Sequence, residues 1–290
     1  MSLALPALAQ PYFGWNVVRD IEELLRYPFM RNAFAAGTIV AVVSGLIGYF
    51  VVLRASSFAA HALSHIGFAG ATGAVLLGIS PLVGLLAFTG GAGAAMGALG
   101  GRRLRGRDVT IGIVLAWALG LGVLFLSLYA GYAGQAYAIL FGSILGISQR
   151  DVLVTLSAGG LTLLVLAGMY RPLLFASVDE TLAEARGVPV LTLSIAFMLV
   201  LAVAVSEAVQ VVGVLLVFAL LVTPAAIADR MVARPVHGLL FSAGLALVFT
   251  WAGLTTAYYL PYPVSFFITT AAFLSYVGVR LVERLRQRGD

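Results

Sequence analysis

Two histidines are notable because both lie inside a long apolar stretch. His61 and His65 occur in FAAHALSHIGFAGA, four residues apart. Residues at this spacing share one face of a helix, so the two imidazoles can bind the same divalent ion. Zinc usually takes three or four protein ligands and manganese prefers added carboxylates, so the pair is incomplete as a storage site. An incomplete site suits transport, because the ion must leave again.

The histidines also have a purely structural interpretation. Each imidazole could bond a backbone carbonyl or a serine hydroxyl across a helix bundle, and Ser57 and Ser64 are close enough in sequence to take part. We favour an ion pathway, because ionisable groups inside a membrane are expensive and usually mark a route for ions. A metalloprotease is excluded, since the motif H-E-x-x-H needs a glutamate where this chain has Ala62.

A third ionisable residue, Glu207, interrupts the apolar stretch AVSEAVQ. We expect it at the outer side of a short turn between two membrane crossings. It could be a carboxylate ligand or an entry guide for a cation, and it could equally be an exposed turn residue. Both interpretations stay open at this point.

The composition explains why so few charged residues need to be considered. Of 290 residues, 61% are hydrophobic and only 10% are charged, which excludes a soluble enzyme and indicates a protein largely surrounded by lipid. All 17 basic residues are arginines, so the chain lacks the lysine of a phosphate-binding loop and cannot supply a standard ATP site. With zero cysteines, disulfides and thiolate metal sites are excluded as well.

Since a helix needs about 20 apolar residues to cross a bilayer, the sequence predicts an all-α, polytopic transmembrane bundle of eight to ten spans. Residues 1–32 are expected to form an N-terminal interfacial segment, and residues 33–290 one transmembrane domain. Residues 135–148 are apolar but too short to span, which predicts a re-entrant piece or half-helix. The predicted crossings are residues 33–53, 58–79, 81–100, 110–131, 151–169, 191–206, 209–228, 237–258 and 263–281.

The net charge of +5 comes from arginines in short clusters between apolar runs. This arrangement is typical of cytoplasmic loops rather than of nucleic-acid binding. Counting arginines places these clusters and the loop of residues 170–189 inside the cell, and the N-terminus outside. In that loop Asp179 can cap a short helix, and Gly187 followed by Pro189 can end it. The loop could be a surface cap or a handle for a soluble partner.

Several short motifs, found in order between about residues 30 and 282, resemble the membrane permeases of ABC importers for zinc, manganese or iron. Each motif is weak alone, but the ordered set is specific. The motifs are Arg54 followed by HIGFAG (His65 to Gly70), DVTIGI (Asp108 to Ile113), LFG (Leu140 to Gly142), the D-x-x-x-A-x-x-x-G pattern of Asp179, Ala183 and Gly187, and VGVLLVFALLVTPAAIA (Val212 to Ala228).

The resemblance implies a permease subunit that is not itself an enzyme, in the plasma membrane of a prokaryote. Its partners would be a cytoplasmic ABC ATPase, an extracytoplasmic metal-binding protein and a second permease, either another copy or a homologue. A helix near residues 176–189 would be similar to the coupling helix that docks on the ATPase, with Asp179, Glu180, Ala183 and Gly187 as coupling residues. No permanently bound cofactor is expected.

The candidate metal ligands are His61, His65 and Glu207, of which His65 matches the histidine of the family. The resemblance implies Zn²⁺ or Mn²⁺ as the transported ion, with iron as a third candidate. Many relatives have an aspartate where this chain has His61. Imidazole in place of a hard oxygen ligand favours zinc over manganese. Two other functions stay open: an ATP-independent secondary carrier of divalent cations, and an ABC permease for a metal chelate or vitamin.

Overall fold

The computed structural model describes residues 23–99, 104–129, 142 and 144–287. Within these ranges the regular structure consists of helices, and no strand occurs. Residues 1–22, most of the predicted interfacial segment, lie outside the described residues. So do Arg102, Arg103 and most of the predicted half-helix at residues 135–148. The described part of that piece includes one turn of 3₁₀-helix, η1 (Ile144–Gly146).

Nine of the described helices have 18 or more residues. They are α2 (Pro28–Leu53), α3 (Ser57–Leu76), α4 (Pro81–Leu99), α5 (Leu104–Leu128), α7 (Gln149–Val178), α9 (Val190–Val212), α10 (Val214–Met231), α11 (Pro235–Tyr259) and α12 (Val264–Arg286). Eight of them are long and apolar enough to cross a membrane, and α3 is the exception because histidines and glycines lower its hydropathy. The predicted polytopic helical bundle is confirmed.

Proline is the first residue of three of these nine helices. Pro28, Pro81 and Pro235 are the first residues of α2, α4 and α11. Proline suits this position because its missing N–H would have no partner in the first turn and its φ is already helical. The start of α7 uses side chains instead, since Ser148 and Asp151 form a reciprocal capping box. These local signals are the reason that most of the predicted starts lie within a few residues of the observed ones.

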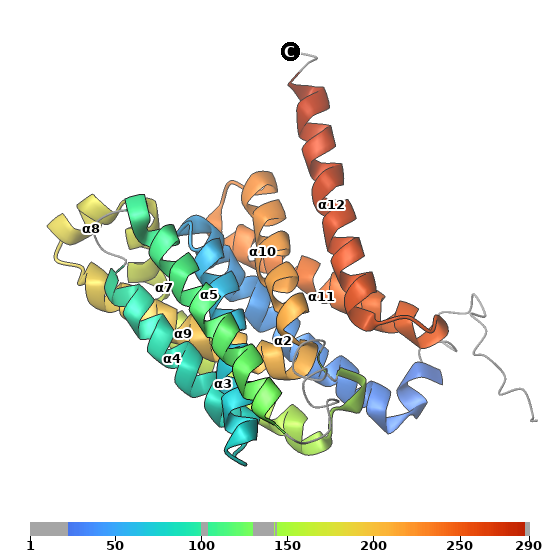
Figure 1. The fold of residues 1–290 in the computed structure, drawn as a ribbon. Coiled ribbons are helices and arrows are strands. Elements are labelled where there is room, and N and C mark those ends of the chain that lie inside the picture. The colour runs from blue at the N-terminus through green and yellow to red at the C-terminus, as the bar shows by residue number, and fades with distance from the viewer. Residues whose placement is uncertain (1–22, 100–103, 130–141, 143, 288–290) are drawn as a thin grey trace, which may run out of the picture.

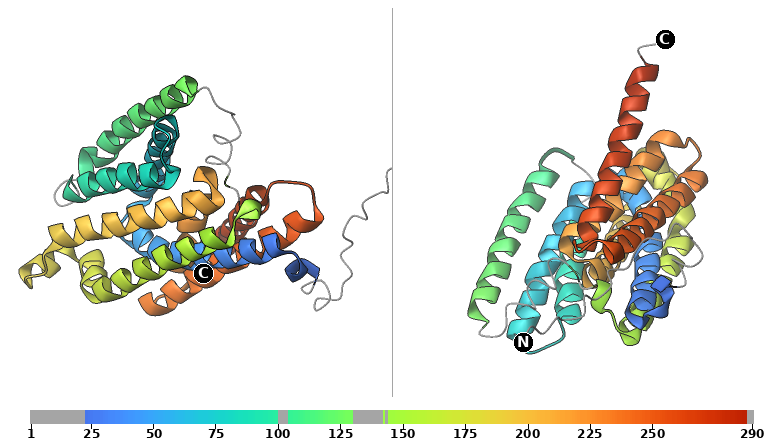
Figure 2. Two further views of the ribbon diagram at one scale, coloured as in Figure 1. Left: turned by 90° about the horizontal axis from the view of Figure 1, so that it is seen from below. Right: turned by 90° about the vertical axis from the view of Figure 1, so that its right-hand side faces the viewer.

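Three groups of helices make up the bundle (Figures 1 and 2). The hairpin of α3 and α4, with α5 against α3, lies on one side of α9. On the other side α2 packs against α7, α10 and α11. The last helix, α12, packs against α10 and α11, and its C-terminal end extends beyond the other helices in Figure 1. Arg230 of α10 forms an ion pair with Glu283 of α12 at 3.2 Å, which links the two helices where α12 leaves the bundle.

Two predicted boundaries are wrong. Glu207 does not lie in a turn, because α9 continues through it to Val212 and ends at Gly213, whose φ of +83° suits glycine. The helix continues because its apolar run resumes after the single carboxylate. Similarly, α7 does not end near residue 169 but extends to Val178 through Arg171 and Pro172. Arg171 is exposed, so the continued helix does not carry its charge into the interior.

Glycines allow α2 to approach its neighbours closely. A Cβ at Gly48 would collide with the backbone carbonyl of Leu221 on α10. One turn earlier, a Cβ at Gly45 would lie 2.5 Å from the Cα of Ala243 on α11. Between the same helices, the Ser242 hydroxyl donates to the Gly45 carbonyl at 2.7 Å. Small residues of this kind let membrane helices pack by backbone contact.

We predict that Gly48→Ala destabilises the protein by about 1–3 kcal/mol, the range typical of an overpacked core. The added methyl would separate α2 from α10, because the obstacle is backbone and cannot rotate away. Gly244→Ala on α11 is the matched control, since no heavy atom lies within 4 Å of its added Cβ. Thermal unfolding in detergent should show a lower midpoint for Gly48→Ala alone. Equal midpoints for both variants would contradict this packing argument.

Candidate functional site

The α3 helix brings His61 and His65 together on one face. Their ring centroids are 4.6 Å apart with the rings steeply inclined, and both side chains are partly buried. The ring of Phe218 on α10 lies against His61, with centroids 5.0 Å apart. The predicted helical pairing of the two imidazoles is therefore observed, and α10 bounds one side of it.

The packing of α3 leaves His61 on the side of α10. Its glycine face is used against α4, where a Cβ at Gly70 would meet the backbone of Gly84. Another side contacts α5, where Phe68 fills the space above Gly122. A further side of α3 contacts α9 and α10, and there His61 lies against Phe218 of α10.

The surroundings of the pair do not match the structural interpretation of the histidines. The Ser64 hydroxyl donates to the backbone carbonyl of His61 at 2.8 Å and not to an imidazole. The Nδ1 atom of His61 is buried without a hydrogen-bond partner among the described residues. A buried polar atom normally has a partner, so an unpaired imidazole nitrogen is chemically available to a ligand.

Glu207 lies on α9 at a separate position. Only 5% of its surface is exposed, and neither carboxylate oxygen has a hydrogen-bond partner among the described residues. Its Oε1 atom lies opposite Gly159 of α7, near Ile39 and Val43 of α2. The carboxylate thus contacts the α2 and α7 side of α9. The alternative of an exposed turn residue is wrong, and its role as a metal ligand stays a prediction.

Within the described part of the chain, no three histidine, cysteine, aspartate or glutamate side chains gather in a metal-holding group. The histidine pair and Glu207 are thus two separate polar positions in this conformation. All three residues are recognisable from the sequence. Glu207 does not join the histidine pair because its side of α9 contacts α2 and α7. A metal ion at the histidines would need further ligands from water or from another chain.

The loop between α7 and α9 forms the short helix α8 (Glu180–Ala185). As predicted, Asp179 caps it by accepting a hydrogen bond from the Leu182 N–H at 2.8 Å. Ala183 is fully buried, so it anchors the helix to the bundle. Gly187 has a φ of +81°, a left-handed conformation that ends the turn and favours glycine.

The outer side of α8 is exposed and has both charge and apolar surface. Glu180 and Glu184 are exposed, and next to them Leu182 is 45% and Val178 73% exposed. These two apolar residues are not among the predicted coupling residues. The available signal was that both lie within a few residues of acidic side chains in a loop expected to lie in water. Such a surface is suited to contact another protein.

Comparison with known proteins agrees with these features. Residues 26–283 match the model of the ABC 3 transport family. The manganese transport system membrane protein MntC of Halalkalibacterium halodurans is 31% identical over 239 residues, covering 82% of each chain. The manganese import system permease protein ScaB of Streptococcus parasanguinis is 31% identical over 259 residues, covering 89% of this chain and 92% of ScaB.

Solved structures show the same fold. The structure of PsaBC from Streptococcus pneumoniae in complex with Fab superposes with a TM-score of 0.81 at 28% identity, over 91% of this chain and 95% of that one. An inward-facing metal-chelate type ABC transporter is similar in fold, with a TM-score of 0.67 at 18% identity, over 94% of this chain and 91% of that one. The protein is a multi-pass protein of the plasma membrane, and the chain belongs to the ABC 3 transport family as a membrane permease of the metal ABC importer group.

Proposed function

We propose that this chain is the membrane permease of an ATP-driven importer of divalent transition-metal ions. The observation that carries the proposal is the pair of imidazoles on α3, one with an unpaired buried nitrogen, in a chain of this family. ATP hydrolysis belongs to a separate cytoplasmic subunit, since this chain has no lysine for a phosphate-binding loop. An extracytoplasmic metal-binding protein delivers the ion.

The mechanism is alternating access at the interface of two permeases, either two copies of this chain or this chain and a homologue. The ion enters outside, passes His61 and His65, and is released inside when ATP turnover resets the pair. Two imidazoles hold the ion weakly enough to release it, while ligands from the second permease or from water complete its coordination. Glu207 remains a candidate further ligand, for a conformation in which α9 has moved relative to α3.

The metal is selected in part by His61. Imidazole at this position favours zinc, whereas the similar proteins MntC and ScaB are named for manganese. We propose zinc as the preferred ion and manganese as the next. An ATP-independent secondary carrier is the less favoured function, because coupling to protons or sodium would need more ionisable groups than this interior has. A chelate or vitamin permease would bind at a wider site with fewer imidazoles.

We predict that His65→Ala abolishes metal uptake while the permease still assembles with its ATPase. Removing one imidazole leaves a single protein ligand on α3, which cannot compete with water for the ion. His237→Ala is the matched control, because this histidine is exposed at the start of α11. Uptake of radioactive zinc or manganese by cells expressing each variant measures the effect. Unchanged uptake by His65→Ala would refute the site assignment.

We further predict that His61→Asp shifts selectivity from zinc toward manganese. The substitution replaces a borderline nitrogen donor with a hard oxygen donor at the same helical position. Competition between the two ions in the same uptake assay gives the ratio of zinc uptake to manganese uptake. This ratio should fall about tenfold or more, which corresponds to about 1.4 kcal/mol of relative binding free energy. An unchanged ratio would place selectivity in the binding protein or in other residues.

For α8, we predict that Glu180→Ala combined with Gly187→Ala uncouples the permease from its ATPase. The first change removes an exposed charge, and the second forces alanine into a left-handed conformation that costs about 1 kcal/mol. The tagged chain is extracted in mild detergent, and the co-purifying ATPase and its metal-stimulated activity are measured. Arg150→Ala, at the far end of α7, is the control.

The wild-type chain in this experiment tests the proposed function itself. A small ATPase in fixed ratio is expected. A lone oligomer, under conditions that preserve other ABC complexes, would favour the secondary carrier instead. If the double variant still assembles with the ATPase and its ATP hydrolysis is still stimulated by metal, only the proposed role of α8 is contradicted.

A further inference from the structure

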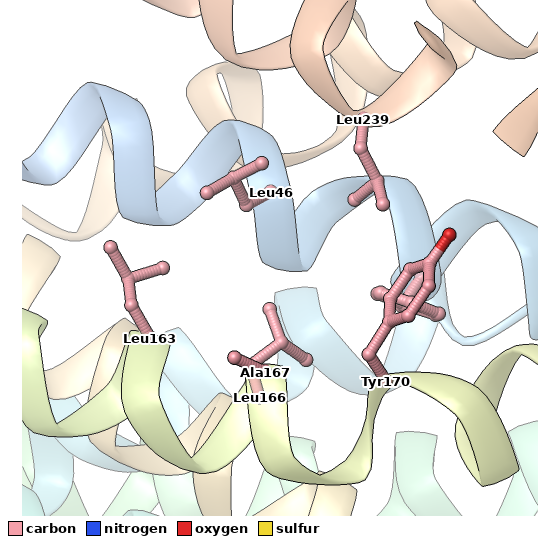
Figure 3. A pocket seen from close by; sticks show the side chains of 7 residues that line it. Leu46, Leu163, Leu166, Ala167, Tyr170 and Leu239 are labelled. Atoms are coloured by element: carbon pink, nitrogen blue, oxygen red, sulfur yellow. The ribbon is translucent and has the colours of Figure 1, made fainter. Parts of the chain in front are cut away.

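A groove remains open on the membrane-facing side of α2. Its floor is Leu46 and Phe50, and its volume is about 420 Å³. One wall comes from α7 and the other from Leu239 of α11 (Figure 3). The α7 residues that line it are Leu163, Leu166, Ala167 and Tyr170. In the described part of the chain α7 and α11 each pack against α2 but not extensively against each other, which leaves the groove between them.

The chemistry of the groove selects an apolar ligand with a polar end. Every lining side chain is hydrocarbon except Tyr170, whose hydroxyl lies beside Leu239 at one end (Figure 3). The volume falls in the range of about 300–1,000 Å³ that is usual for small-molecule sites. Because its three helices are long and apolar enough to cross the bilayer, the fluid around the groove is lipid hydrocarbon. A tyrosine at the end of such a groove is typical of headgroup level.

Positive charge lies at the same end. Arg171 follows Ala167 by four residues, so it shares the groove-lining face of α7. Arg234 is the N-cap of α11, five residues before Leu239. Both arginines are exposed, and the ion pairs of the described residues involve neither. Asp229 acts electrostatically on Tyr49, whose ring lies against Gly238 next to Leu239, so one carboxylate also lies near this end, where the two arginines outnumber it.

From this combination we infer that the groove binds one anionic phospholipid of the inner leaflet. An acyl chain lies between α7 and α11 along Leu46, Leu163 and Ala167, and the phosphate lies near Arg171 and Arg234. The end with the arginines is the cytoplasmic one in the proposed orientation, and the cytoplasmic leaflet is the one rich in anionic lipid. The lipid fills the space that α7 and α11 leave open, and so it couples the helix that leads to α8 to the rest of the bundle.

The test is native mass spectrometry of the purified full chain, delipidated and then titrated with phosphatidylglycerol or with phosphatidylcholine of the same acyl chains. Wild-type protein should bind one phosphatidylglycerol per chain and should bind phosphatidylcholine more weakly. Arg171→Gln with Arg234→Gln should lower the affinity for phosphatidylglycerol by about fivefold per arginine. Arg150→Gln, an exposed arginine at the other end of α7, should leave it unchanged.

A second variant tests the groove itself. Ala167→Phe places a ring in the groove and should abolish retention of phosphatidylglycerol. Leu164→Phe, at a position that is 73% exposed on the next face of α7, should not. Equal retention of both lipids by wild-type protein, or full retention by Ala167→Phe, would overturn the proposal. A loss of oligomer mass in Ala167→Phe with lipid binding intact would show that another protein copy occupies the groove, and would overturn it as well.

Discussion

The backbone contact of α2 with α10 and α11 is the constraint on which the other features depend. Lipid provides no hydrophobic force to hold helices together, so these contacts must come from close packing and from polar bonds. Gly45 and Gly48 have no side chains to keep the helices apart, and the Ser242 hydroxyl donates to the buried Gly45 carbonyl. With α10 held in this way, Phe218 lies against His61. With α11 held in this way, a groove is left beside α7.

The polar groups of the interior fall into two kinds. Some are satisfied locally, such as Thr89 and Ser206, which bond each other at 2.8 Å across α4 and α9. Others, including His61 Nδ1 and both oxygens of Glu207, are buried without a partner among the described residues. An unpaired polar group is costly in a membrane, and a ligand that binds for part of the proposed transport cycle would offset this cost.

The long helix α7 connects the membrane interior with α8. It passes Glu207 at Gly159, lines the groove from Leu163 to Tyr170, and ends at the N-cap of α8. Buried Ala183 ties α8 back to the bundle, while Leu182 and Glu180 stay exposed. A continuous helix that contacts each of these positions connects α8 with the bundle, which is what the proposed coupling to an ATPase requires.

By itself, the sequence determined the all-α membrane bundle, most helix boundaries and the pairing of His61 with His65. These follow from local rules: apolar length, proline at helix starts and the spacing of four residues on one helical face. It also identified the cap at Asp179 and the stop at Gly187, because both are local backbone signals. Only the tertiary structure decided that Glu207 is buried inside α9 and contacts α7 rather than the histidines. Likewise it alone decided that α7 and α11 leave a groove beside α2. Both depend on which helix faces meet, and that is set by glycine contacts between segments far apart in the chain.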